Sequence, residues 1–174
     1  IQRVREAERD RVFQEYSDKV GQLVRGVVQQ VDRGNVIVKL DFSEGLLPAR
    51  EQIPRSYHRQ GDYVRAVVIN VDKSAKGPQV ILSRTHPDFL RRLFESEVPE
   101  IADHIVEVKA VSREAGARSK ISVFSTDPRV DAVGSCVGLK GSRVQSIVRE
   151  LGGERIDIVP WSADPAVFVS RALA

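Results

Sequence analysis

Hydrophobic and polar residues alternate with a period of two through much of the first half of this chain. Such alternation predicts half-buried β-strands. It recurs in five short segments, which are residues 20–31, 35–40, 45–48, 63–71 and 80–84. Turn-forming pairs such as Gly34-Asn35 and Gly61-Asp62 separate the segments. Five short strands in so little chain predict a closed barrel, and a five-stranded antiparallel OB fold is the default at this size.

Residues 1–19 have a different pattern, that of a solvated helix. Five basic and five acidic residues interleave there without glycine or proline, and opposite charges four residues apart stabilise an exposed helix. The apolar residues Phe13, Tyr16 and Val20 fall at helical spacing near its end. We therefore expect a connector helix over residues 1–19 that docks only through its last turn.

The second half of the chain mixes helical and strand patterns. Pro87 starts a predicted helix that runs to residue 94, because proline suits the first turn of a helix. Two alternating runs, residues 105–111 and 120–124, predict a hairpin with its loop at residues 112–117. Asp127-Pro128 then signals the start of another helical region.

A further helix and strand complete this half. Four apolar residues at spacing i, i+3, i+4 and i+7 predict one helical stripe, formed by Val144, Ile147, Val148 and Leu151. Gly152-Gly153 ends that helix, and residues 154–159 predict a last strand. We therefore predict an α+β chain of two domains, with the barrel over residues 20–85. The second domain, residues 86–174, should pack its helices on a three-stranded mixed sheet.

Gly138-Leu139-Lys140-Gly141 lies between two of the predicted helices. Glycine occupies 12 of 174 positions, so this spacing alone is weak evidence. The surrounding order of helices and strands is nevertheless that of a KH module, whose Gly-x-x-Gly turn clamps a nucleic-acid backbone. Lys140 would place a charge at the phosphates, and Ser142 and Arg143 open a helix whose N-terminus favours an anion. A helical hairpin without a ligand remains the alternative, although it has no need of the lysine.

The same stretch holds a possible cysteine nucleophile. Gly134-Ser135-Cys136-Val137-Gly138 matches a cysteine version of the nucleophile elbow, which needs an incoming strand and a later histidine. All three histidines, His58, His86 and His104, come earlier in the chain. We predict that Cys136 is a small buried side chain and that the chain has no catalytic residue. Nucleotide-loop and zinc motifs are also missing, so we expect no metal and no cofactor.

Composition adds little to this picture. The formal net charge of +3 and pI of about 9.2 suit a polyanionic partner and solubility equally well. A single cysteine excludes an internal disulfide and fits a reducing compartment, and no long apolar run or signal peptide is present. We expect a cytoplasmic protein without membrane contact. Because the chain starts at Ile1 and contains no methionine, we also expect it to be a piece of a longer protein.

Together these motifs resemble the middle of the bacterial NusA family of transcription factors. The resemblance rests on stretches along the whole chain, which are residues 5–9, 45–48, 61–64, 82–87, 137–145 and 152–157. It implies an S-one-type OB barrel followed by the first of two type-II KH domains. It also implies that an amino-terminal domain contacting RNA polymerase and a second KH domain are missing. The family binds single-stranded nascent RNA in pausing, termination and antitermination, alongside other transcription factors and without catalysis.

The chain departs from the family pattern at one place. S-one-type barrels usually carry stacking residues where this chain has Arg33, Val36 and Pro48. Stacking contributes about 1 to 3 kcal/mol per base, so we expect the KH domain to supply most of the RNA affinity. Arg25, Arg33 and Lys39 would hold phosphates on the barrel weakly and in a salt-dependent way.

Two other functions stay open on the sequence. The chain could be the RNA-binding portion of an RNA-processing exoribonuclease, although the phosphorolytic kind places its KH domain first. The barrel could also serve mainly to dock on polymerase. In the favoured interpretation the chain is a monomer that binds RNA across the barrel and the KH groove, which the short junction Thr85-His86-Pro87 links.

Overall fold

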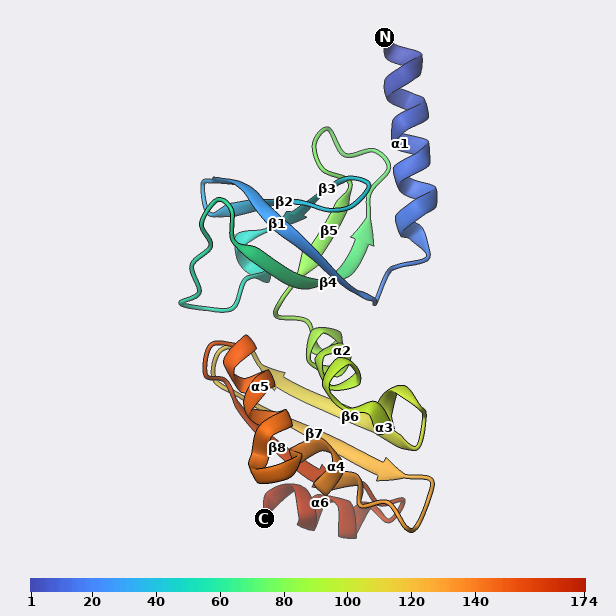
Figure 1. The fold of residues 1–174 in the computed structure, drawn as a ribbon, viewed down its shortest axis with the longest axis vertical. Helices are drawn as coiled ribbons and strands as arrows, with labels where there is room; N and C mark the ends of the chain where they lie inside the picture. Colours follow the sequence, from blue (N-terminus) through green and yellow to red (C-terminus); the bar gives the residue numbers. More distant parts are fainter. The chain divides into compact units, whose positions relative to one another are not determined.

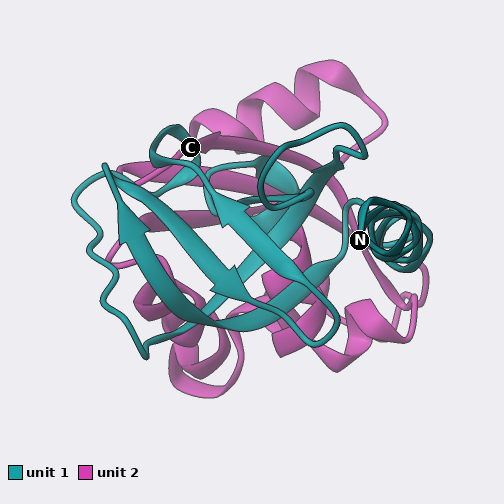
Figure 2. Ribbon diagram, turned by 90° about the horizontal axis from the view of Figure 1, so that it is seen from above, with its two compact units in different colours: residues 1–89 teal, residues 90–174 magenta.

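Helix α1, Gln2–Ser17, opens the chain and docks through its last turn. The computed structural model describes all of residues 1–174, which divide into two units, residues 1–89 and 90–174 (Figures 1 and 2). Tyr16 is 2% exposed within the barrel core, and its hydroxyl accepts a hydrogen bond from the Phe42 N–H at 3.2 Å. Phe13 packs against the same core. Val20 lies beyond the end of the helix and is exposed.

Five strands follow in the first unit and close into a barrel (Figure 1). They are β1 Leu23–Asp32, β2 Asn35–Lys39, β3 Glu44–Leu47, β4 Tyr63–Val71 and β5 Val80–Ser83, with a short 3-10 helix, η1, at Ala49–Glu51. The order around the barrel is β1-β2-β3-β5-β4. Successive side chains of a strand point to opposite faces. The alternating apolar residues of the sequence therefore face the interior of the barrel, and the residues between them face outward.

The predicted five-stranded barrel is confirmed, but it is mixed rather than wholly antiparallel. Four ladders are antiparallel, whereas β3 and β5 pair in parallel, with Gly45 opposite Val80 and Leu46 opposite Ile81. A closed ring with an odd number of strands cannot alternate direction at every step. One parallel pair is therefore a consequence of closure.

Valine and leucine fill the barrel, among them Val28, Val36, Val38, Leu47, Val68, Val80 and Leu82, each at most 1% exposed. Gly26 marks the tightest backbone approach in this core. A Cβ on Gly26 would lie 2.5 Å from the Lys39 carbonyl oxygen, so no larger residue fits without moving β2.

His58, in the loop between β3 and β4, has a buried Nε2 without a hydrogen-bond partner. Burial lowers the pKa of its imidazole from the ordinary value of 6.5, and the positive charge of Arg84 lowers it further. Between the lowered pKa and 6.5, the unfolded chain takes up a proton that the folded chain does not. The free energy of unfolding therefore decreases as the pH falls through this window.

We expect the barrel to unfold at lower urea concentration at pH 5 than at pH 7, and His58→Gln should reduce this difference. Urea titrations read from the NMR amide signals of the barrel core will measure it. His104→Asn, at an exposed histidine of the other unit, is the matched control. An equal pH dependence in the wild type and in His58→Gln would contradict the prediction.

The second unit is built on a three-stranded sheet. Its strands are β6 Val106–Glu114, β7 Arg118–Ser125 and β8 Arg155–Pro160. β6 and β7 are antiparallel, β7 and β8 are parallel, and β8 lies at an edge. The predicted mixed sheet is therefore confirmed. The hairpin loop is shorter than predicted, because Ser112, Arg113 and Glu114 continue the ladder opposite Lys120, Ser119 and Arg118.

The helices of this unit are α2 Pro87–Glu97, α3 Pro99–Ala102, α4 Ala132–Val137, the 3-10 turn η2 Leu139–Gly141, α5 Ser142–Glu150 and α6 Pro165–Leu173. They include those expected from the sequence and two that were not predicted, α3 and α6. α4 and α5 pack on the sheet at β8, and α6 also contacts β8 (Figure 1). The sequence analysis did not predict α6. Its start is visible as Asp164-Pro165, where the Asp164 carboxylate accepts the Ala166 N–H at 3.0 Å.

A buried ion pair joins the β6–β7 hairpin to the start of β8. The side chains of Arg113 and Glu154 are both fully buried, with Nε and Oε2 3.1 Å apart. The Glu154 carboxylate also accepts the Gly116 N–H and the Ser119 hydroxyl, each at 2.8 Å. Every carboxylate oxygen therefore has a donor, as a buried charge requires.

Candidate nucleic-acid interface

The Gly-x-x-Gly turn has a backbone that depends on its glycines. Gly138 has φ 77° and ψ 173°, a conformation that essentially only glycine adopts. Lys140 and Gly141 follow in the left-handed region, with φ of 54° and 74°. The side chains between the glycines point outward, since Leu139 is 84% exposed and Lys140 is also exposed. The turn thus presents an apolar side chain and a cation at its tip.

Helix α5 starts directly after this turn. Its N-cap is Gly141, and no side chain caps the helix. The first N–H groups of a helix have no partner within the helix, and they carry the positive end of its dipole. Ser142 is the exposed first residue. Lys140 and the start of α5 therefore form a small positive surface that suits a phosphate.

Arg143 has a different role from the one that its position in the sequence suggests. Its Nη1 donates to Glu100 Oε2 at 2.9 Å and to the Ser135 carbonyl oxygen at 2.7 Å. These bonds tie α5 to α3 and to α4. A Cβ on Gly138 would lie 2.6 Å from Arg143 Cγ, so the arginine stem packs under the turn. We infer that Arg143 positions the turn, while Lys140 is left for a ligand.

A groove of about 390 Å³ runs beside the turn, between the two helices and the edge strand β8. Val137 and Val144 line it from the helices, and Ile156 and Ile158 line it from β8. Lys120, Asp157 and Arg171 add polar groups. Apolar and charged side chains thus share the groove, which lies along the edge strand next to the turn.

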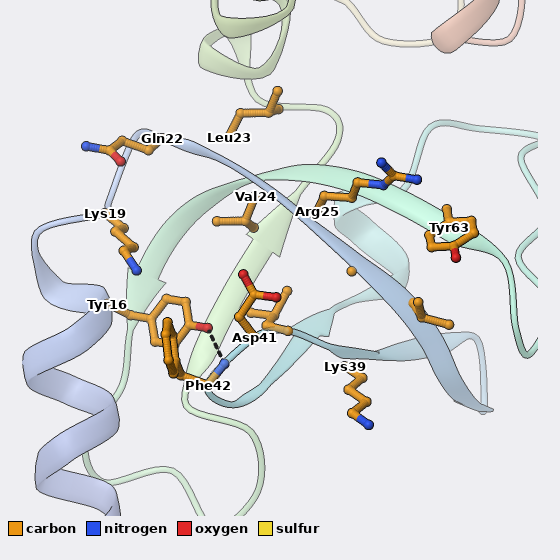
Figure 3. Close-up of a pocket in the computed structure, with 13 residues that line it drawn as sticks. Tyr16, Lys19, Gln22, Leu23, Val24, Arg25, Lys39, Asp41, Phe42 and Tyr63 are labelled. Carbon is orange, nitrogen blue, oxygen red and sulfur yellow. Dashed lines mark hydrogen bonds between the residues drawn. The ribbon is translucent and has the colours of Figure 1, made fainter.

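The barrel brings two of the predicted phosphate ligands together. Arg25 and Lys39 both line a groove of about 730 Å³ next to the end of α1 (Figure 3). The Arg25 guanidinium lies 4.5 Å from the centroid of the Tyr63 ring. Arg33 does not line this groove, because it occupies the tight β1–β2 turn with φ 50°.

The sequence analysis missed two aromatic residues of the barrel. Phe42 and Tyr63 are 61% and 71% exposed and line the groove with Arg25 and Lys39 (Figure 3). A signal for both existed, since Phe42 follows the second predicted strand and Tyr63 opens the fourth, directly after the Gly61-Asp62 turn. The barrel thus has exposed rings, although not at the positions of Arg33, Val36 and Pro48.

The cysteine motif is not a nucleophile elbow. Cys136 lies on α4, is fully buried, and has a thiol pKa raised to about 12, chiefly by that burial. A thiolate is not available there at neutral pH. No three His, Cys, Asp or Glu side chains come together as a metal site would require. None of the helices has the length and apolar character needed to cross a membrane.

A closed five-stranded barrel followed by a KH arrangement defines a tandem nucleic-acid-binding protein. Residues 17–83 match the S1 RNA binding domain family, and residues 84–161 match the NusA-like first KH domain family. The chain is therefore similar to an S1 domain followed by a NusA-like first KH domain, the arrangement of the central region of NusA.

The similarity to NusA extends over the whole chain. The chain is 54% identical over 173 residues to the transcription termination/antitermination protein NusA of Bacillus subtilis. The match covers 99% of this chain and 47% of that protein. The NusA proteins of Thermus thermophilus and Mycobacterium bovis are 49% and 45% identical over 174 and 182 residues. Those matches cover 99% and 100% of this chain and 45% and 52% of the relatives. The chain thus spans about half the length of the curated relatives it matches.

Proposed function

We propose that this chain is the RNA-binding part of a transcription factor that holds single-stranded nascent RNA during pausing, termination and antitermination. The observation that carries the proposal is the exposed Leu139-Lys140 tip, which stands next to an uncapped helix start and the groove along β8. The printed names of the relatives, which are termination and antitermination proteins, support the transcriptional role.

Binding divides between the turn and the groove. The glycines let the RNA backbone approach the peptide chain closely, and Lys140 with the first N–H groups of α5 neutralises a phosphate. The bases then lie against Val144 and Ile156, where the edge of β8 offers main-chain hydrogen bonds. The residues that we propose to contact RNA are Gly138, Leu139, Lys140, Gly141 and Ser142, with Arg143 holding the turn.

This role requires no chemistry from the chain. We propose that it acts as a binding module without catalytic activity, as a monomer in the cytoplasm. RNA polymerase would be contacted mainly by a domain outside this chain, and other transcription factors would join the complex. The barrel would contribute weaker phosphate contacts through Arg25, Lys39 and Arg33.

Replacing Leu139 and Lys140 together with aspartate should weaken binding of single-stranded RNA at least about tenfold, which is about 1.4 kcal/mol. Two negative charges at the tip repel the phosphate, and both side chains point into solvent, so the fold should persist. Fluorescence anisotropy with a labelled short RNA at fixed salt will measure the affinity, and circular dichroism will check the fold.

Val4→Asp with Lys76→Asp is the matched control. It makes the same change of charge at two exposed positions of the first unit. The affinity should stay within about twofold, because neither position lines the turn or a groove and salt screens exposed charges. Unchanged RNA binding by the Leu139→Asp, Lys140→Asp chain would refute the role of the turn.

A further inference from the structure

The wall of the barrel has a gap beside the first half of β1. This strand pairs with β4 from Leu23 onward, but it pairs with β2 only from Val27 onward, opposite Lys39. Residues 23–26 therefore have a neighbouring strand on one side only. On their other side lies the groove of Figure 3, which residues 22–27 line.

Main-chain polar groups of β1 point into this gap. The Gln22 carbonyl oxygen accepts the Val68 N–H at 3.1 Å, so the main-chain bonds of Gln22 lie on the β4 side. Successive residues of an antiparallel strand direct their N–H and C=O groups to opposite sides. Leu23 and Arg25 consequently direct theirs into the gap, where no strand of the barrel meets them.

The spacing of these groups is that of a polypeptide. Leu23 and Arg25 are two residues apart, so their N–H and C=O groups repeat about every 7 Å along the strand. An extended peptide has the same repeat of donors and acceptors and can pair with both residues as one more strand. RNA phosphates accept hydrogen bonds but donate none, so they would leave the Leu23 and Arg25 carbonyl oxygens unmatched. The gap therefore fits a peptide backbone better than an RNA backbone.

The charges beside the gap favour an acidic peptide. Arg25 and Lys39 are exposed, line the groove and form no ion pair. Lys19 also lines the groove, but its ammonium already pairs with Glu15 at 2.9 Å. Asp41 is the one carboxylate among the lining residues. Two cations are therefore left for the carboxylates of a ligand.

The alternation of β1 also sets the order of residues in such a peptide. Val24 packs against the barrel core, whereas Arg25 is exposed. Residues opposite each other on neighbouring strands point to the same face. The peptide residue beside Val24 should therefore be apolar, and its two neighbours should be acidic. The exposed rings of Phe42 and Tyr63 border the groove and offer further apolar contacts (Figure 3).

We propose that this gap is a docking site for an acidic, extended segment of a protein partner. The segment pairs with Leu23 and Arg25 as an added strand and places its carboxylates at Arg25 and Lys39. The inference goes beyond the proposed RNA-binding function, because it requires neither RNA nor the KH turn. A bound segment covers Arg25 and Lys39 and so excludes RNA phosphates from them.

NMR titration of the chain with a blocked hexapeptide of alternating aspartate and valine tests the site. The inference expects amide shifts and slower hydrogen exchange centred on residues 23–27. Arg25→Glu with Lys39→Glu should weaken the binding at least about tenfold, because like charges then meet, and this chain should bind a lysine–valine hexapeptide instead. Lys76→Glu with Arg59→Glu is the matched control, since both positions are exposed in the first unit and do not line the groove.

Two N-methylated peptides separate strand pairing from a general attraction between charges. Methylation of every aspartate N–H, or of every valine N–H, removes the donors along one edge of the extended peptide. One of these two peptides should lose binding while the other keeps it. Binding of both as tight as that of the unmodified peptide would overturn the docking site, and so would shifts of equal size at the control positions.

The proposed function is tested separately from this inference. The chain with Leu139→Asp and Lys140→Asp, which should lose RNA binding, should bind the acidic hexapeptide as the unaltered chain does. Shifts of the groove with single-stranded RNA but not with the hexapeptide would overturn the inference and leave the proposed function standing. Peptide binding that disappears with the KH turn would also overturn it.

Discussion

Glu154→Ala should lower the free energy of unfolding of the second unit by about 3–5 kcal/mol, the cost of breaking a buried ion pair from one side. The substitution leaves the fully buried Arg113 guanidinium without its counter-charge. It also removes the acceptor of the Gly116 N–H and the Ser119 hydroxyl. The hairpin loop would lose its side-chain link to the start of β8, while the β7–β8 ladder would still join the two strands.

Trp161 is the only tryptophan of the chain and directly follows β8, where its main-chain N–H donates to the Val123 carbonyl oxygen. Its fluorescence therefore reports on the unfolding of this unit. Urea unfolding followed by its fluorescence will measure the loss. Glu114→Ala is the control, since Glu114 pairs with Arg118 in an exposed position and such pairs contribute about 0 to 1 kcal/mol. A loss for Glu154→Ala no larger than that of Glu114→Ala would show that the pair does not stabilise the sheet.

Gly138→Ala should destabilise the turn and reduce RNA binding together. An alanine at φ 77° and ψ 173° is strained by about 1–3 kcal/mol. Its Cβ would also lie 2.6 Å from Arg143 Cγ and push the stem that bridges α3 and α4. Displacing the turn should cost RNA affinity at least about tenfold, since a clamp must match the backbone it holds.

Gly141→Ala separates strain from crowding. Gly141 also has a positive φ, 74°, but no atom lies closer than 3.9 Å to a Cβ built there. Its cost should stay near the left-handed penalty of about 1 kcal/mol. Urea unfolding and RNA anisotropy on both variants will compare them, and equal losses would contradict a packing role for Arg143.

Local patterns predicted the elements of this chain well. β4 covers the predicted residues 63–71, and the stripe from Val144 to Leu151 lies on α5 and its C-cap. These elements depend on periodicity within a single segment, which the sequence displays directly. β1 starts at Leu23 rather than at residue 20, because residues 18–21 form the turn after α1. The assignment of Arg33 and of the KH turn to RNA remains a prediction.

The features that local patterns did not predict all depend on residues far apart in the chain. The parallel β3–β5 pair follows from closing a ring of five strands, which no single segment encodes. Arg143 meets Glu100 across 43 positions, so its sequence neighbours gave no sign that it was engaged. Tyr63 lies over Arg25 only because β1 and β4 pair in one particular register.

By itself the sequence determined which segments form strands and helices, that a Gly-x-x-Gly turn with a lysine joins two helices, and that the whole resembles a NusA barrel and KH domain. The spacing of apolar residues, the turn residues and the order of the motifs predict these properties directly. Only the tertiary structure decided that Arg143 holds the turn and that Phe42, Tyr63, Arg25 and Lys39 share one groove. The physical reason is that burial, hydrogen bonding and the meeting of charges with rings depend on the packing of distant segments, which periodicity along the chain does not report.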